Sequence, residues 1–294
     1  MTEPQSVFRF APSPNGELHL GHAYSALLNL KIARASDGKM LLRIEDIDTV
    51  RCTPQLEKQM FEDLEWIGFE WDELPRRQSE HFDDYREALF QLEQMELIYA
   101  SSMSRSEIKQ RVAELEVSGT PWPRDPDGTL LYPGTERQQS QSARKPLNET
   151  FGHHVIRLDM AKTVEQQRGN LSWEETIGVS PNNTRSIPAD PLVWGDVILA
   201  RRDTPTSYHL SCIVDDAKQN ITHIVRGQDL YHSTSVHRLL QELLGLSAPL
   251  YHHHELVLDK TGKKLSKSDR DTSLRQLRQS GTSKEQILKM IGFE

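Results

Sequence analysis

A short strand that feeds a helix through a tight loop, near the start of the chain, limits the folds open to this sequence more than any other feature. Val7–Phe10 is an apolar-rich run, and Pro12 and Gly16 break it. From Gly21 onward, apolar residues recur at the spacing of one helix face. The beginning of the chain therefore predicts a strand, a tight loop and a helix, in that order.

The same alternation of strand-like and helix-like segments continues along the chain, with one long interruption. The stretch 101–145 is polar and rich in turn formers, as expected of an inserted subdomain. Alternation with a single interruption predicts an α/β fold whose parallel sheet is divided by an insertion. Further strands are expected at Met40–Ile44, Val155–Leu158, Val197–Leu199 and Ile221–Val225, and helices at Glu57–Ile67, Tyr85–Leu97 and Thr234–Leu244.

Charge and cysteine content restrict the partners and the compartment. The 294 residues carry a formal net charge of −8, which argues against an extended nonspecific duplex binder, because phosphate contacts depend mainly on Lys and Arg. A local basic surface for RNA is still compatible with that charge. No apolar run approaches the ~20 residues of a membrane span, and the only cysteines, Cys52 and Cys212, stand far apart. We expect a cytoplasmic monomer without a membrane partner.

Two short motifs carry the chemistry. His19 and His22 lie three positions apart at the expected helix start, where they share a face and where the positive helix end favours phosphate. Gly21 between them lets a ligand approach the backbone closely. Near the other end, Lys264 and Lys267 stand in a polar loop, and lysine is a mobile cation suited to closing on a triphosphate. Taken singly, the first motif could be two ordinary surface histidines and the second a solvated basic loop. Both motifs together, in this order and one near each end, are far less expected by chance.

With these motifs the sequence resembles the class I aminoacyl-tRNA synthetases, and the extended first motif is specifically similar to their glutamyl and glutaminyl branch. The resemblance covers nearly the whole chain. It implies a Rossmann-type catalytic core with an inserted α/β subdomain and a short C-terminal helical segment. The motifs are R-F-A-P-S-P-N-G-x-L-H-L-G-H at 9–22, L-R-I-E-D-I-D at 42–48, S-Y-H-L at 207–210, V-R-G-Q-D-L at 225–230 and K-L-S-K-S at 264–268.

On this resemblance the chain divides into four parts. The first half of the Rossmann-type core takes residues 1–98 and the second half takes residues 191–252. The inserted subdomain, the zinc-type region without its cysteines, lies between them at 99–190. The K-L-S-K-S loop and the C-terminal helical segment occupy 253–294.

The resemblance also implies a pocket for glutamate. Because glutamate carries two carboxylates and one ammonium group, its site requires at least two cationic or donor groups and one anion. Arg9 and Arg226 are suited to fork onto carboxylates, and Glu45 is suited to pair with the ammonium group. Taken singly, such residues usually form surface ion pairs, so the expectation rests on their joint match. The expected glutamate-binding residues are Arg9, Ala11, Ser13, Glu45, Tyr208 and Arg226.

ATP, with Mg²⁺ on its phosphates, is the second substrate that the resemblance implies. The glutamate α-carboxylate attacks the α-phosphate, so the reaction needs no side-chain nucleophile and depends on positioning and charge stabilisation. The histidines would stabilise the reacting phosphate and the ribose side, and the lysines would neutralise the β- and γ-phosphates. The expected ATP-binding residues are His19, Gly21, His22 and Lys267, and the expected catalytic residues are His19, His22, Lys264 and Lys267.

No metal site is predicted in the protein itself. Relatives often hold zinc with cysteines in the inserted region, but Ser101, Met103 and Glu136 stand at those positions here. Tyr132 and Glu136 alone cannot close a tetrahedral zinc site. The run at 252–254 consists of three histidines, which cannot all converge on one ion from a regular strand or helix. A solvated or partly buried run is expected there.

The acceptor is the least determined part of the function. The chain ends 26 residues after Ser268, whereas full glutamyl-tRNA synthetases continue with a large anticodon-binding region. The resemblance to shortened members therefore implies transfer of glutamate to the queuosine base of the tRNA(Asp) anticodon. The alternatives are a glutamyl-tRNA ligase acting on the 3′ end of tRNA(Glu) and a non-catalytic glutamate- or nucleotide-binding paralogue. Cys212, where full enzymes tend to present an asparagine, suggests a weaker hold on glutamate.

Overall fold

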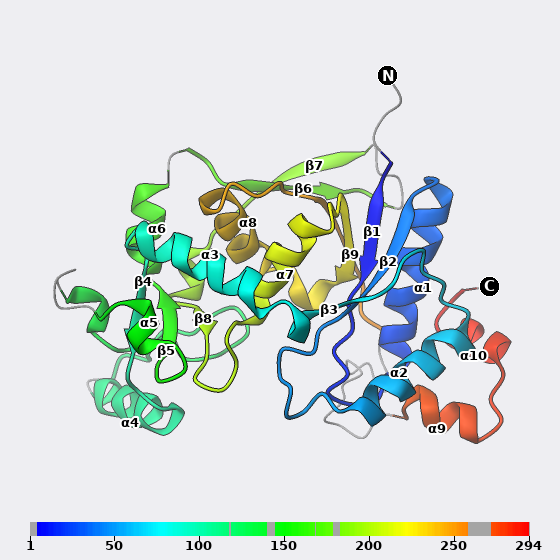
Figure 1. The fold of residues 1–294 in the computed structure, drawn as a ribbon, viewed down its shortest axis with the longest axis horizontal. Coiled ribbons are helices and arrows are strands. Elements are labelled where there is room, and N and C mark those ends of the chain that lie inside the picture. The colour runs from blue at the N-terminus through cyan, green and yellow to red at the C-terminus, as the bar shows by residue number, and fades with distance from the viewer. Residues whose placement is uncertain are drawn as a thin grey trace.

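The computed structural model describes residues 5–117, 119–139, 145–167, 169–178, 183–257 and 272–293. In these ranges seven strands form the larger sheet, in the order β3-β2-β1-β9-β10-β6-β7 (Figure 1). All neighbours in it are parallel except β6 and β7, which are antiparallel. The strands are β1 (Val7–Phe10), β2 (Lys39–Ile44), β3 (Arg76–Arg77), β6 (Ser172–Thr176), β7 (Thr184–Pro188), β9 (His223–Gly227) and β10 (Leu250–His254).

Helices cover both faces of this sheet, and strand alternation decides which side chains meet them. Phe8 and Phe10 of β1 pack in the apolar cluster formed with α1, whereas Arg9 between them reaches the helix α7. Arg9 is therefore buried on the face opposite to the two phenylalanines. The helices on the α1 side are α1 (Leu20–Ala35), α2 (Pro54–Ile67), α9 (Leu274–Gln279) and α10 (Lys284–Met290); those on the α7 side are α3 (Phe82–Gln94), α7 (Tyr208–Lys218) and α8 (Thr234–Leu243).

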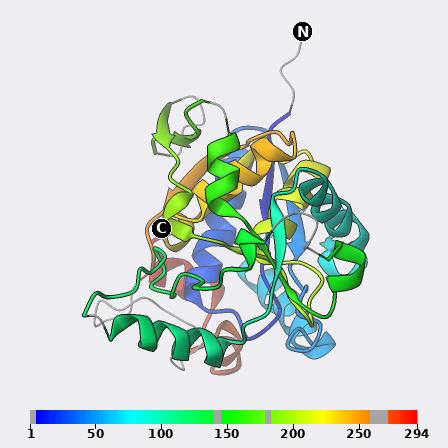
Figure 2. The same ribbon diagram turned by 90° about the vertical axis from the view of Figure 1, so that its left-hand side faces the viewer.

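A second, antiparallel sheet lies beyond α3, at the left of Figure 1, and faces the viewer in Figure 2. It consists of β4 (Ile98–Ser101), β5 (Val155–Leu158) and β8 (Ile198–Ala200). The helix α4 (Arg105–Glu116) runs along its periphery and buries only Val112. Two short helices, α5 (Leu147–Thr150) and α6 (Met160–Gln166), flank β5 in the sequence.

The predicted α/β class with a parallel sheet is confirmed. The four-part division of the chain stays a proposal, to which the sheets add one observation. β6 and β7, which fall within 99–190, lie in the larger sheet, whereas β8, beyond residue 190, lies in the smaller one. None of the helices in the described ranges combines the length and the apolar composition that a bilayer span requires.

One predicted helix, Tyr85–Leu97, is wrong at both ends, since α3 begins at Phe82 and ends at Gln94. Glu96 adopts a left-handed conformation with φ 60°. The Leu97 N–H then bonds to the carbonyl of Leu92 at 3.0 Å, which is the closing bond of a Schellman motif. The apolar residues after Gln94 thus enter β4 and do not continue the helix.

Candidate active site

The candidate active site is a crevice at the carboxyl ends of the central parallel strands. β1 has β2 on one side and β9 on the other, so the strand order reverses at β1. Ligands of open α/β sheets bind at such a point, outside the strand ends. A cavity of ≈ 400 Å³, the strand-end cavity, lies there. Its lining contains every predicted site residue of the described ranges: Arg9, Ala11, Ser13, His19, Gly21, His22, Glu45, Tyr208 and Arg226.

His19 and His22 stand at the N-terminus of α1, with ring centroids 3.9 Å apart. Nδ1 of His22 accepts the His19 backbone N–H at 3.1 Å, and Nδ1 of His19 accepts the Gly21 N–H at 3.1 Å. Because both Nδ1 atoms are acceptors, each neutral ring carries its proton on Nε2. A Cβ at Gly21 would lie 3.0 Å from Cε1 of His19, so the glycine also makes room for that ring. The arrangement suits a phosphate at the positive end of the helix.

Arg9 and Arg43 reach one carboxylate, that of Asp216 on α7, from neighbouring strands. Nε of Arg9 donates to Oδ1 of Asp216 at 3.0 Å, and Nη1 of Arg43 donates to the same oxygen at 2.7 Å. Nη2 of Arg43 also donates to Oε1 of Glu45 at 3.1 Å. Only the Glu45 side chain is more than a few per cent exposed, at 13%. The predicted acid for the ammonium group is thus held in place by a fully buried guanidinium.

The burial and the charges of this cluster shift its pKa values. Burial alone would raise the pKa of Asp216, but Arg9 and Arg43 lower it below its ordinary value. Burial raises the pKa of Glu45, and Arg43 and Arg9 oppose that shift. Burial also raises the pKa of the Tyr208 hydroxyl, so the phenol keeps its proton at neutral pH and stays a donor. The cluster is therefore a fixed set of charges around a protonated phenol.

Arg226 and Tyr208 bring a second guanidinium and this phenol to the cavity. Nη1 of Arg226 donates to the Tyr208 hydroxyl oxygen at 3.4 Å. Ala11 and Ser13 come from the loop after β1, and the Ser13 hydroxyl lies 3.6 Å from the Cys52 sulfur. The roles predicted for these residues stay predictions, but all of them share one cavity.

The predicted catalytic residues Lys264 and Lys267 lie outside the described residues. The described residues on either side of that gap lie at the site. Val257 lines the cavity, and Ser273 pairs with His19 in an isolated antiparallel bridge. The roles of the two lysines therefore stay predictions.

Sequence reasoning missed the buried partners of the site, chiefly Arg43, Asp215 and Asp216. Asp215 accepts hydrogen bonds from Arg76 at 2.8 Å and from Gln78 at 2.7 Å. One available signal was Arg43 itself, a charged residue within the otherwise apolar run Met40–Ile44. A charged residue in a central strand is buried only where it has a partner for its charge.

Cys212, which the sequence placed near the amino acid, is fully buried and absent from the cavity lining. Its sulfur lies 3.5 Å from Oδ2 of Asp216 and 3.7 Å from Nη2 of Arg43. Burial, followed by the Asp216 carboxylate, raises the pKa of this thiol to about 12, so it stays protonated. Cys212 thus touches the groups that hold Arg9 and Glu45, behind the cavity wall.

The zinc-type region is held by hydrogen bonds between protein groups. Oε1 of Glu136 accepts from the Ser102 hydroxyl and from the Tyr132 hydroxyl, each at 2.7 Å. The Ser101 hydroxyl accepts from Nε of Arg157 at 3.2 Å. Within the described ranges, no three His, Cys, Asp or Glu side chains are grouped to hold a metal ion. The absence of zinc stays a prediction, which elemental analysis of the purified protein checks.

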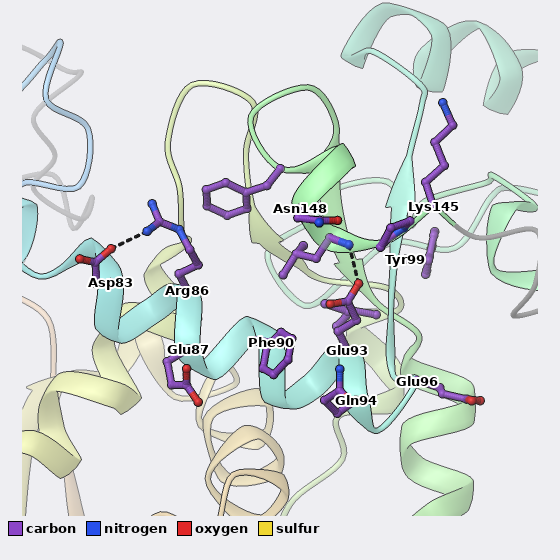
Figure 3. A pocket seen from close by; sticks show the side chains of 14 residues that line it. Asp83, Arg86, Glu87, Phe90, Glu93, Gln94, Glu96, Tyr99, Lys145 and Asn148 are labelled. Atoms are coloured by element: carbon purple, nitrogen blue, oxygen red, sulfur yellow. Dashed lines mark hydrogen bonds and ion pairs between the residues drawn. The ribbon is translucent and has the colours of Figure 1, made fainter.

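A larger cavity, of ≈ 1100 Å³, lies on the outer face of α3 beside α5, and we name it the α3 cavity (Figure 3). None of the predicted site residues lines it. Within its lining, Glu93 of α3 accepts a hydrogen bond from the Leu147 backbone N–H of α5, and Arg86 pairs with Asp83. The charged and aromatic residues of its lining are Asp83, Arg86, Glu87, Phe90, Glu93, Glu96, Tyr99, Lys145 and Phe151.

A parallel sheet with a cavity at its switch point, and a histidine pair on the first helix, are features expected of the catalytic domain of a class I aminoacyl-tRNA synthetase. The match to a known family is more specific. The family described as "tRNA synthetases class I (E and Q), catalytic domain" matches residues 6–293, and the chain belongs to it. The predicted fold, family and ligase-type enzyme class are thereby confirmed, and the family implies the use of ATP.

Individual relatives differ in how much of their length this chain covers. A Rhodobacter capsulatus protein named glutamyl-Q tRNA(Asp) synthetase is 43% identical, over 98% of this chain and 100% of that one. A Synechococcus protein named glutamate–tRNA ligase is 33% identical, over 97% of this chain and 56% of that one. The solved glutamate–tRNA synthetase of Elizabethkingia anophelis is 31% identical with a TM-score of 0.70, over 95% of this chain and 54% of that one. The chain thus spans just over half the length of the latter two.

Proposed function

We propose that this enzyme uses ATP to activate L-glutamate and transfers the glutamyl group to the queuosine base in the anticodon of tRNA(Asp). The observation that carries the first step is one cavity with two guanidinium groups, Arg9 and Arg226, and the Glu45 carboxylate. This is the set of charges that an amino acid with two carboxylates and one ammonium group requires. The His19–His22 pair supplies a phosphate-binding helix end beside it.

The chemistry needs orientation more than reactive side chains. An oxygen of the glutamate α-carboxylate attacks the α-phosphorus of ATP, and the bond to pyrophosphate breaks, which leaves glutamyl-adenylate. Arg226 and Tyr208 orient the side-chain carboxylate, and Glu45 fixes the ammonium group. His19 and His22 donate from Nε2 to the phosphate oxygens as charge moves onto the leaving group.

Mg²⁺ belongs to the proposal as the companion of the ATP phosphates. Asp229 lines the strand-end cavity together with Glu45, which is assigned to the ammonium group, and the described residues offer no three-ligand group. This donor set suits an ion carried by the nucleotide, because protein-bound Mg²⁺ commonly has one or two carboxylates plus substrate phosphates. The ion would offset phosphate charge there.

The acceptor rests on chemistry and on the relative of matching length. The Rhodobacter protein, which this chain covers in full, bears a name that specifies tRNA(Asp). The cyclopentenediol of queuosine carries vicinal hydroxyls like those of a terminal ribose, so one of them can attack the same adenylate. A single stem-loop also requires few phosphate contacts, which agrees with the net charge of −8.

The test combines two assays of the purified protein. Glutamate-dependent exchange of pyrophosphate into ATP should appear with Mg²⁺ and without any tRNA. Labelled glutamate should then enter queuosine-containing tRNA(Asp). Queuosine-free tRNA(Asp) is the matched control, and periodate oxidation of the diol should abolish the labelling. Without exchange in any condition, the enzyme is a binding paralogue and the proposal fails.

A second candidate is a glutamate–tRNA ligase that charges the 3′ end of tRNA(Glu). The Synechococcus and Elizabethkingia enzymes, which bear that name, are more than 30% identical to this chain. Labelled glutamate that appears on the 3′ end of tRNA(Glu) favours this candidate. The monomeric state and the cytoplasmic location stay predictions that these assays leave untouched.

A further inference from the structure

Arg226 is a buried cation whose hydrogen-bond donors all meet neutral acceptors. The residue is only 4% exposed, although its guanidinium reaches the strand-end cavity. Both atoms Nη1 and Nη2 make two contacts, and Nε makes one. The acceptors are Nε2 of His253 at 3.1 Å, Nδ1 of His237 at 3.2 Å, the Tyr208 hydroxyl at 3.4 Å, the Thr234 hydroxyl at 2.7 Å and the Leu230 carbonyl at 3.2 Å.

The other pocket arginine is held differently. Arg9 shares the Asp216 carboxylate with Arg43, so its charge is balanced inside the protein. No carboxylate of the described residues lies within ion-pair distance of Arg226. The nearest acid along its bonds is Glu175, which reaches it only through the ring of His253. The two guanidiniums thus differ in the charge that they leave for a ligand.

Hydrogen bonds fix the tautomers of the histidines around Arg226. Nδ1 of His253 faces Oε2 of Glu175 at 2.8 Å and must donate, which leaves Nε2 to accept from Arg226. Nδ1 of His237 accepts from Arg226, so its Nε2–H donates to Nδ1 of His209 at 3.2 Å. Each ring can accept from a cation only while it is neutral. A protonated ring would lose its bond to Arg226 and repel it.

Burial favours those neutral forms. Burial, with a smaller effect of Arg226, lowers the pKa of His209 to about 4 and that of His237 well below its ordinary value. Burial lowers the pKa of His253 to about 4 even though Glu175 acts in the opposite direction. The Glu175–His253 contact is therefore a hydrogen bond to a neutral ring at pH 7.

We propose that His237 and His253 are positioning residues that hold Arg226 rigidly without neutralising it, and that this uncompensated charge selects the side-chain carboxylate of glutamate over the amide of glutamine. The inference rests on the proposed function, because it assumes that Arg226 faces the glutamate side chain. Its physical basis is that a buried cation without an internal counterion is best satisfied by an anionic ligand. A neutral amide leaves that charge unpaired.

The test replaces His237 with two side chains of nearly equal shape and different charge. In His237→Asn the amide oxygen takes over the role of Nδ1 as a neutral acceptor. In His237→Asp a carboxylate takes the same place, and the adjacent Arg226 keeps it ionised. We expect the Asp variant to raise the glutamate KM by about tenfold or more, the size of a close charge-pair coupling. Selectivity for glutamate over glutamine should fall by a similar factor, and the Asn variant should retain most of it.

Pyrophosphate exchange with glutamate and with glutamine gives the glutamate KM and the selectivity, with the ATP KM as the internal control. A purely structural role would change kcat or stability in both variants alike and would leave the ratio of glutamate to glutamine unaltered. If Asp and Asn variants discriminate equally well, the inference is wrong. Should either variant fold poorly, Glu175→Gln and His253→Gln provide the second measurement. In Glu175→Gln the His253 ring remains the neutral acceptor for Arg226, and in His253→Gln an amide oxygen takes its place. Discrimination should therefore persist in both, and its loss would overturn the inference.

The two failures are distinguishable. If the wild-type protein neither binds glutamate by calorimetry nor supports exchange, the proposed function itself is wrong. If wild-type exchange is normal and glutamate-specific but insensitive to a charge at position 237, only the role of the histidines is overturned.

Discussion

The α3 cavity and the strand-end cavity differ in size, but the more informative difference is how their charged side chains are held. The α3 cavity has more than twice the volume, but its acids stand in water: the side chains of Asp83 and Glu96 are 91% and 50% exposed. In the strand-end cavity, Arg9 and its partner Asp216 are 5% and 3% exposed.

Exposure sets what such charges can do. Surface ion pairs contribute about 0–1 kcal/mol and adjust freely, whereas buried pairs keep one geometry and are costly to break. Recognition of a small charged molecule requires groups that are oriented before it arrives. Rigidly held charges, more than volume, therefore mark the site.

The largest effect is expected at Asp216. Replacing it with Asn leaves Arg9 and Arg43 without their shared counterion, which should reduce the free energy of unfolding by about 3–5 kcal/mol. Asp83→Asn in the α3 cavity should change it by less than about 0.5 kcal/mol, because that carboxylate is exposed. Urea unfolding of both variants measures the difference. Equal losses would mean that the two cavities hold their charges alike.

The next effect concerns glutamate. Arg226→Ala removes the uncompensated guanidinium and should weaken glutamate binding by about 2–5 kcal/mol, with little change for ATP. Arg86→Ala in the α3 cavity is the matched control, since Arg86 is 54% exposed and pairs with Asp83. Calorimetric titration with glutamate and with ATP separates the two effects. An unaltered glutamate affinity in Arg226→Ala would remove this arginine from the pocket.

A smaller effect is expected from pH. The unfolded chain binds a proton at each histidine below about 6.5, whereas His209 and His253 remain neutral in the folded protein until about 4. The unfolded state therefore binds more protons between pH 6.5 and about 4. As the pH is lowered through this window, the free energy of unfolding decreases by about 1 kcal/mol per pH unit for each such residue.

Unfolding in urea at pH 7 and at pH 5 measures this slope. His253→Gln should flatten it, while His153→Gln, on the exposed surface, should not. No histidine lines the α3 cavity, whereas His253 bonds to Arg226 of the strand-end cavity. Equal pH slopes of the unfolding free energy in the wild type and in both variants would contradict the role given to His253.

The smallest effect is expected at the α3 cavity itself. Glu87→Gln and Phe90→Ala alter its acidic and aromatic lining without touching the buried cluster. Each should leave glutamate-dependent pyrophosphate exchange within about twofold of wild type, since surface substitutions usually act within ±0.5 kcal/mol. A large loss of exchange would show that this cavity communicates with the site.

The sequence predicted the residues that touch the site better than those that hold it. R-F-A-P-S-P-N-G-x-L-H-L-G-H is a contiguous signal, and the structure gathers the site residues predicted from it with Glu45, Tyr208 and Arg226. Asp215 and Asp216, by contrast, carry no local signal, because nothing in their segment shows that α7 turns Asp216 to β1 and β2 and Asp215 to Arg76 of β3. Residues that are brought together only by tertiary packing show no characteristic spacing in the sequence.

The same limit applies around Arg226 and at element ends. His237 and His253 come from α8 and β10, and neither segment on its own indicates a shared arginine. The end of α3 depended on Glu96 adopting a left-handed conformation, which glutamate rarely does. Periodicity found the helix, but local backbone chemistry decided its limits.

The bond between Arg9 and Asp216 spans 207 positions of the sequence. A ribosome adding roughly 5–20 residues per second makes the arginine about 10–40 s before its carboxylate exists. During that interval β1 has β2 as a neighbour but lacks β9, and two arginines await a counterion. The site and the middle of the sheet are therefore completed together, late in synthesis.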